Sequence, residues 1–143
     1  VERMHHFASA TLVDPRGWLL MQERDEHARI DPEVWGFPGG GVESGETYES
    51  AAYRELAEET GVHLETGLES FGRFRFYSEP CGGDDEFELF AAATRRTEVE
   101  CHEGRQMVFV DPAVLVGLPL TRSAALVLTD FLSSDLYRKL APS

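Results

Sequence analysis

The stretch from Gly39 to Val62, GGGVESGETYESAAYRELAEETGV, joins a glycine run to a helical segment that ends in three crowded glutamates. On a helical wheel, Glu55, Glu58 and Glu59 fall within an arc of about 100°. Like charges at this spacing destabilise a helix by a few tenths of a kcal/mol per pair. The crowding is therefore either tolerated on a solvated face or needed for a ligand.

The helix itself is predicted to run from Thr47 to Thr60. Thr47 is the expected N-cap, and Gly61 stands where a left-handed C-cap belongs. Ser50 at the third helical position leaves the expected capping box incomplete. The residues expected to pack against a sheet share another arc of the wheel: Tyr53, Leu56 and Ala57.

Two features favour a ligand over a solvated acidic face. Ala51 and Ala52 are small residues that leave room beside the carboxylates, and the glycine run lets backbone approach whatever they hold. Clustered oxygen ligands with open space suit hard divalent cations such as Mg²⁺, which keep several waters. The sequence therefore predicts a cation site on this face.

The spacing also matches a known motif. Gly40, five residues, Glu46, seven residues and then RELAEETGV (Arg54–Val62) fill every defined position of G-x5-E-x7-R-E-U-x-E-E-x-G-U, where U is aliphatic. The segment resembles the Nudix box, and WGFPGGG just before it extends the likeness. The resemblance implies an α/β fold of the Nudix type, an α/β/α sandwich whose mixed sheet is flanked by helices, over a single domain of residues 1–143.

The resemblance also implies an activity: metal-dependent hydrolysis of the diphosphate linkage in a nucleoside diphosphate derivative, with Mg²⁺ or Mn²⁺ as cofactor. The positions that match metal ligands are Glu55, Glu58, Glu59 and the carbonyl of Gly40. Arg54 and Glu46 match a pair that holds loop and helix together, and arginine suits this task because its planar fork can pair bidentately.

A general base is expected on the later loop that contains Glu98, Glu100 and Glu103. Glu103 is preferred, because HEGRQMVFVDP resembles the run E-G-x-x-M-x-F-x-x-P of many relatives. A solvated loop glutamate is the alternative, and then a box glutamate, Glu59 or Glu55, would take the proton. His102 is interpreted as a surface residue.

Substrate contacts are predicted outside the box. The candidates are Arg24, Phe37 and Tyr77, with Trp35 or Phe37 either stacking on a base or packing in the core, and with Arg73 and Arg75 as further candidates for phosphate. ADP-ribose-type relatives tend to carry a proline where Phe76, Tyr77 and Ser78 stand, and Tyr77 hints at dinucleoside polyphosphates. The acidic run at 84–88 lacks EF-hand spacing and is interpreted as a solvated hairpin loop.

The remaining chain predicts strands and one long helix. Strands are expected at 7–13, 18–22, 70–79, 86–94 and 106–112, with hairpin connections at 14–17 and 80–85, and an amphipathic helix at 121–140. Together these elements predict a mixed sheet with helices on both sides.

Composition limits the partners. The 143 residues carry a net charge of −13, which repels phosphate backbones and argues against broad nucleic-acid binding. The sequence has no apolar run of about 18 residues and no signal-peptide region, so no membrane association is expected. Cys81 and Cys101 are expected to be reduced thiols in a cytoplasmic protein with a small-molecule substrate; a homodimer is among the expected states.

Two alternatives to a hydrolase stay open. One is a catalytically silent Nudix-fold module that binds a nucleotide as a sensor, although such members usually show a damaged box. The other is an enzyme similar to isopentenyl-diphosphate isomerases, which would need Cys81 or Cys101 as an additional catalytic group.

Overall fold

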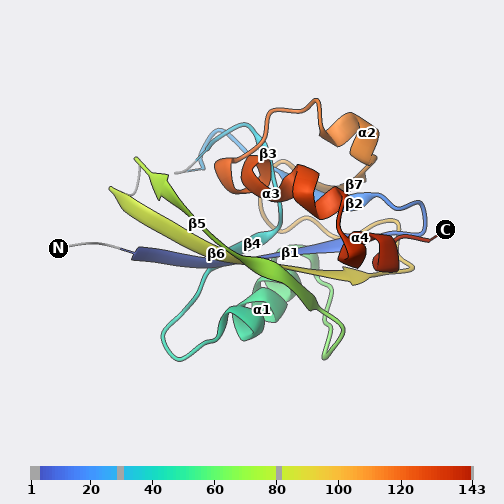
Figure 1. The fold of residues 1–143 in the computed structure, drawn as a ribbon, viewed down its shortest axis with the longest axis horizontal. Coiled ribbons are helices and arrows are strands. Elements are labelled where there is room, and N and C mark those ends of the chain that lie inside the picture. Colours follow the sequence, from blue (N-terminus) through green and yellow to red (C-terminus); the bar gives the residue numbers. More distant parts are fainter. Residues whose placement is uncertain (1–3, 29–30, 80–81, 143) are drawn as a thin grey trace.

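The computed structural model describes residues 4–28, 31–79 and 82–142, which build a seven-stranded mixed sheet between helices (Figure 1). The strand order is β3-β2-β1-β6-β5, with β4 also paired to β1 and β7 to β2. The strands are β1 (Met4–Val13), β2 (Leu19–Glu23), β3 (Trp35–Gly36), β4 (Gly39–Gly41), β5 (Glu69–Ser78), β6 (Gly83–Ala93) and β7 (Gln106–Val110). The central pair, β1 and β6, is parallel, and the other pairs are antiparallel.

Helices cover both faces of the sheet. Helix α1 (Tyr48–Thr60) lies on one face, and α2 (Pro112–Leu115), α3 (Arg122–Leu132) and α4 (Asp135–Leu140) lie on the other (Figure 1). Side chains alternate accordingly along the central strands. Ala8, Ala10 and Leu12 of β1 pack in the core under α1, whereas Phe87, Leu89 and Ala91 of β6 pack in the core under α3. The predicted α/β/α sandwich with a mixed sheet is confirmed.

Helix α1 corrects two details of the prediction. Its capping box is complete, because Ser50 Oγ accepts from Thr47 N (3.0 Å) and Thr47 Oγ1 accepts from Ser50 N (3.0 Å), so a serine hydroxyl replaces the expected glutamate. Ala51 and Ala52 are fully buried together with Leu56, so the alanines pack in the core instead of leaving room beside the carboxylates. Their small size brings the helix close to the sheet.

The carboxy-terminal region forms two helices where one was predicted. The break falls at Ser133–Ser134, where Ser134 Oγ donates to Phe131 O (2.6 Å) and accepts from Tyr137 N (3.1 Å) as the N-cap of α4. Serine competes with helical hydrogen bonding in this way. The short helix α2 was not predicted; Asp111 caps it and Pro112 opens it. Within the described residues, no helix is both long and apolar enough to cross a bilayer.

Candidate active site

The glycine strand β4 lies directly against the carboxylates of α1. A Cβ atom at position 40 would stand 2.6 Å from the carboxylate carbon of Glu55, so only glycine permits this approach. The Gly39 N–H donates to Glu59 Oε1 over 3.4 Å. Two of the three clustered glutamates therefore face a backbone that side chains do not cover.

The buried Glu59 and the partly exposed Glu55 form a carboxyl pair. Glu59 is 4% exposed and shares a hydrogen bond with Glu55. Burial, the bond to Glu55 and the charge of Glu103 together raise the pKa of Glu59 to about 10. A buried carboxyl next to a second carboxylate ionises readily only when positive charge compensates it. A shared proton meets this need, and a divalent cation with oxygen ligands would meet it too, so the donor set fits the predicted metal.

Glu58 does not join this pair. Its side chain is 59% exposed, and its Oε2 accepts from Arg54 Nη1 over 3.2 Å. Across the ranges 4–28, 31–79 and 82–142, acidic, histidine and cysteine side chains do not gather in a group of three that could hold a metal. In the structure Glu55, Glu59 and the Gly40 backbone thus lie together. Glu58 pairs instead with Arg54, one helical turn earlier, and its side chain stays outside this group.

Arg54 connects the loop, the helix and β4. Its guanidinium binds Glu46 bidentately, with Nε to Oε2 at 2.7 Å and Nη2 to Oε1 at 2.9 Å. It also donates to Glu55 Oε1 (2.8 Å) and to the Gly41 carbonyl (2.9 Å). The hydrogen bonds from Arg54, followed by that from the Glu43 N–H, lower the pKa of Glu46 to about 2. This is the geometry that the organising role requires.

Replacing Arg54 with alanine should therefore reduce both stability and activity. The change leaves Glu46 and Glu55 without their shared donor, and hydrogen bonds to charged groups are among the stronger ones. We expect the melting temperature to fall by about 5–10 °C. The matched control is Arg73→Ala, because Arg73 pairs with Glu88 (2.9 Å) at an exposed position and should matter little. A stable and fully active Arg54→Ala protein would contradict the assigned role.

The loop before β7 is fastened to the end of α1. His102 N donates to Glu59 O (2.9 Å), His102 Nδ1 contacts Glu58 O (2.7 Å), and Nε2 contacts a carboxylate oxygen of Glu100 (2.7 Å). The bonds to Glu100 and to the Glu58 carbonyl raise the pKa of His102. His102 is a surface residue, as interpreted from the sequence, and its exposed ring also ties this loop to the glutamate helix.

The same loop places Glu103 beside the carboxyl pair. Gly104 adopts φ +83°, and a Cβ there would stand 2.7 Å from Glu23 O, so glycine lets the loop turn tightly against β2. Of the three candidate bases, Glu103 lines the neighbouring cavity, whereas Glu100 is bound to His102 and Glu98 is an exposed residue farther up the loop.

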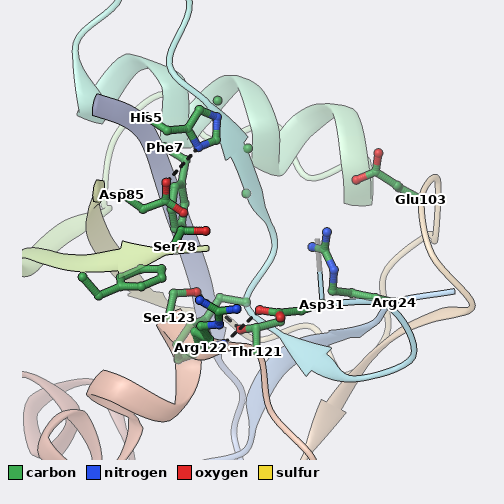
Figure 2. Close-up of a pocket in the computed structure, with 16 residues that line it drawn as sticks. His5, Phe7, Arg24, Asp31, Ser78, Asp85, Glu103, Thr121, Arg122 and Ser123 are labelled. Atoms are coloured by element: carbon green, nitrogen blue, oxygen red, sulfur yellow. Dashed lines mark hydrogen bonds and ion pairs between the residues drawn. The ribbon is translucent and has the colours of Figure 1, made fainter. Parts of the chain in front are cut away.

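A cavity of about 270 Å³ opens beside β4. Arg24 and Glu103 line one end (Figure 2), and Gly39–Gly41 line the side where β4 pairs with β1. The other end is lined by His5, Asp85 and Ser78, and Phe7, Phe37 and Phe76 supply apolar surface. The start of α3 closes a third side with Thr121, Arg122 and Ser123, where the Arg122 N–H donates to Asp31 Oδ2 (3.1 Å).

The predicted substrate residues divide into two groups. Arg24 and Phe37 line the cavity, as the prediction requires. Tyr77 does not: it is 60% exposed, because strand alternation turns it away from the face that carries Phe76 and Ser78. Trp35 packs against the core under α3. The side chains of Arg73 and Arg75 bind Glu88 and Glu86 on the adjacent strand rather than lining the cavity.

The acidic run at 84–88 belongs to β6 and is not a solvated loop. Asp85 and Phe87 are buried, and the strand begins at Gly83, so the predicted loop at 80–85 was too long. Period-two alternation, which places Asp85 on the face of Phe87 and Leu89, was the signal that could have identified it. Cys81 lies outside the described residues. Cys101 is exposed, and its Sγ contacts Glu103 O at 3.3 Å.

Comparison with known proteins places this site in a family. Residues 4–121 match the family described as NUDIX domain. An RNA pyrophosphohydrolase from Caulobacter vibrioides is 50% identical over 62 residues, which cover 43% of this chain and 33% of that protein. The chain thus spans about a third of the length of the curated relatives that it matches.

Solved structures share the fold at lower identity. The MutT protein from Methanosarcina mazei Go1 superposes with a TM-score of 0.76 at 20% identity, covering 96% of this chain and 95% of that one. The NUDIX domain of Shewanella oneidensis NrtR, complexed with ADP ribose, gives 0.74 at 19% identity, covering 90% and 86%. With its family match over most of the described fold and its complete box at β4 and α1, the chain belongs to the Nudix family.

Proposed function

We propose that this protein hydrolyses the diphosphate linkage of a nucleoside diphosphate derivative with the help of Mg²⁺ or Mn²⁺. The observation that carries the proposal is the pair of the buried Glu59 and the partly exposed Glu55 against the uncovered backbone of β4. The same strand lines a cavity that also contains Arg24 and Glu103. The backbone that the carboxyl pair faces is therefore also a wall of the cavity that Arg24 and Glu103 line.

Glu55, Glu59 and the Gly40 backbone would hold the cation, and Glu58 could join them by giving up its contact with Arg54. A bound divalent cation neutralises a diphosphate and makes a water molecule more acidic. Arg54 orients Glu55 through the hydrogen bond of 2.8 Å. Its bidentate pair with Glu46 fixes the loop between β4 and α1, so the ligands stay in register with the glycine strand.

Glu103 is the proposed general base. It lines the cavity from a loop that the backbone of α1 anchors, and its negative charge helps to raise the pKa of Glu59. Arg24 lines the same end of the cavity, where it would contact phosphate oxygens. In-line attack of water at phosphorus needs a base within reach of that water, and we assign Glu103 to accept the proton.

The comparisons support the substrate class. RNA pyrophosphohydrolases and a domain complexed with ADP ribose are among the similar proteins, and both names point to substrates or ligands with linked phosphates. The net charge of −13 favours a small nucleotide over RNA for this chain. Binding without turnover, as in a sensor, is less well supported, because the carboxyl pair, the arginine clamp and Glu103 are all in place.

Screening nucleoside di- and triphosphates, nucleotide sugars and dinucleoside polyphosphates with Mg²⁺, with Mn²⁺ and with EDTA tests the proposal. Separation of the products identifies which bond breaks. We expect cleavage within a diphosphate linkage in the presence of either cation and none in EDTA. Failure to cleave any member of this panel with cation present, in a folded protein, would contradict the proposal.

A further inference from the structure

Gln22 is a buried polar residue in a row of apolar side chains. It lies on the α1 face of the sheet together with Leu20, two positions earlier in β2, and Met107, its partner across β2 and β7. Leu20 and Met107 belong to the core under α1, and Gln22 is itself only 3% exposed. Burying an amide costs free energy unless it forms hydrogen bonds, so an apolar residue would serve the core better here.

The Gln22 amide binds the loop before β7. Its Nε2 donates to Glu103 O over 3.1 Å, across 81 positions of sequence. The loop backbone lies directly on this side chain, since a Cβ atom at Gly104 would stand 3.0 Å from Gln22 Cγ. Cys101 Sγ donates to the same carbonyl oxygen over 3.3 Å, but a thiol is a weak donor. The amide of Gln22 therefore holds this carbonyl more firmly than the thiol does.

The bond from Gln22 lies between two backbone anchors of the loop. The N–H of His102 is bonded to α1, and the N–H of Arg105 is bonded to β2, each over 2.9 Å. Glu103 stands between these points, and its carbonyl is the group that Gln22 holds. Because a peptide group is planar, holding this carbonyl fixes one of the two peptide groups that set the direction of the Glu103 side chain.

Hydrogen bonds matter at Glu103 because packing around it is sparse. The residue is exposed, and Figure 2 shows it on the loop at the end of α1, across from Arg24. A second cavity, of about 420 Å³, lies against the same loop and is lined by Gln22, Arg24, Glu103 and Gly104 among others. A residue with solvent on one side and a cavity on the other takes its position from the bonds that hold its backbone.

We propose that Gln22 is a positioning residue for the general base: it holds the loop so that Glu103 stays within reach of the attacking water. The inference rests on the proposed function, in which Glu103 accepts the proton. It accounts for an amide in an apolar row, because the amide serves the reaction and the core does not need it. Departures from the apolar pattern of this kind are typical of functional sites.

Replacing Gln22 with methionine should lower kcat by about 5- to 50-fold and leave KM nearly unchanged, since a small displacement of a catalytic group has an effect of this size. Methionine keeps the length of the side chain, suits the apolar row and offers no donor to Glu103 O. The melting temperature should stay within about 3 °C of the wild-type value or rise. The rates are measured on the nucleotide of the screening panel that the wild type cleaves fastest.

A double-mutant cycle shows whether Gln22 acts through Glu103. In the Glu103→Gln background, adding Gln22→Met should change kcat by less than about twofold, because no base is left to position. Single turnovers at high enzyme concentration measure the slow background. Gln106→Met is the matched control: Gln106 donates to Glu23 Oε1 (2.9 Å) on the exposed side of the same strand pair. It should leave kcat unchanged in both backgrounds.

Hydrogen exchange followed by mass spectrometry reports on the loop without turnover. Peptides covering 100–106 should exchange faster in Gln22→Met than in the wild type, whereas α1 should not change. The inference is overturned, and the hydrolase proposal stands, if Gln22→Met leaves kcat or loop exchange unchanged, raises KM instead, loses kcat equally in both backgrounds or does not fold. A wild type that cleaves no nucleotide of the panel would contradict the proposed function, and this inference with it.

Discussion

Replacing Glu59 with glutamine is expected to abolish turnover and to leave the protein as stable as before or more stable. The proposed cation contributes several kcal/mol to catalysis, and each 1.36 kcal/mol is tenfold in rate, so we expect kcat to fall about a thousandfold or more. Stability should not suffer, because Glu59 is buried next to Glu55 and its pKa is raised. Without the cation Glu59 is therefore protonated at neutral pH, and a neutral amide of the same shape can take its place beside Glu55. Initial rates and thermal denaturation measure the two effects.

Glu49→Gln is the matched control for this change. Glu49 lies in the first turn of the same helix and is exposed, so the variant loses the same charge far from the carboxyl pair. It should retain wild-type turnover. If Glu59→Gln remained active, or if Glu49→Gln were equally inactive, the assignment of Glu59 to the cation site would be wrong.

Replacing Glu103 with glutamine should lower kcat by about 10²–10⁴-fold while KM and the dependence on Mg²⁺ stay nearly unchanged. A general base contributes a factor of this size, and its loss affects an interaction made mainly in the transition state. The cation does not need Glu103, because Glu55 and Glu59 lie on α1. Steady-state kinetics at several Mg²⁺ concentrations separates the base from a ligand.

Glu98→Gln and Glu100→Gln are the controls for the base. Glu98 is exposed on the same loop and should tolerate the change. Glu100 accepts from His102, so its variant could loosen the loop and should cost less than the loss of Glu103. If Glu103→Gln were fully active, the base would be a box glutamate. If only Glu98→Gln lost its activity, the base would lie elsewhere on the loop.

Local rules predicted the elements that carry the box. The helix begins and ends where Thr47 and Gly61 were expected to cap it, and the two strands after it, β5 and β6, lie where their apolar residues indicate. These features depend on neighbours within a few positions along the chain. The predicted helix at 121–140 is divided by the cap at Ser134, and in the second helix Tyr137 donates to Gly17 O, 120 positions away.

The candidate site was predictable where the motif fixes it. The spacing correctly predicted that Glu55 and Glu59 lie together. It did not predict that Glu58 pairs with Arg54 and points away from them, because side-chain ion pairs depend on charges from both the helix and the loop. The prediction that Tyr77 contacts the substrate was wrong, because the register of β5 with β6 decides which of its side chains face the cavity. Asp85 was missed for the same reason: strand pairing, which no single segment encodes, brings it beside His5.

The central claim, that the crowded glutamates form a cation site, is tested most directly by thermal denaturation with and without millimolar Mn²⁺. A ligand that binds the folded state at 100 times its Kd stabilises it by about 2.7 kcal/mol. We predict that Mn²⁺ raises the melting temperature of the wild type and of Glu49→Gln by several degrees and leaves Glu59→Gln nearly unchanged. A wild-type melting temperature that is the same with and without Mn²⁺, or an equal rise in Glu59→Gln, would contradict the account.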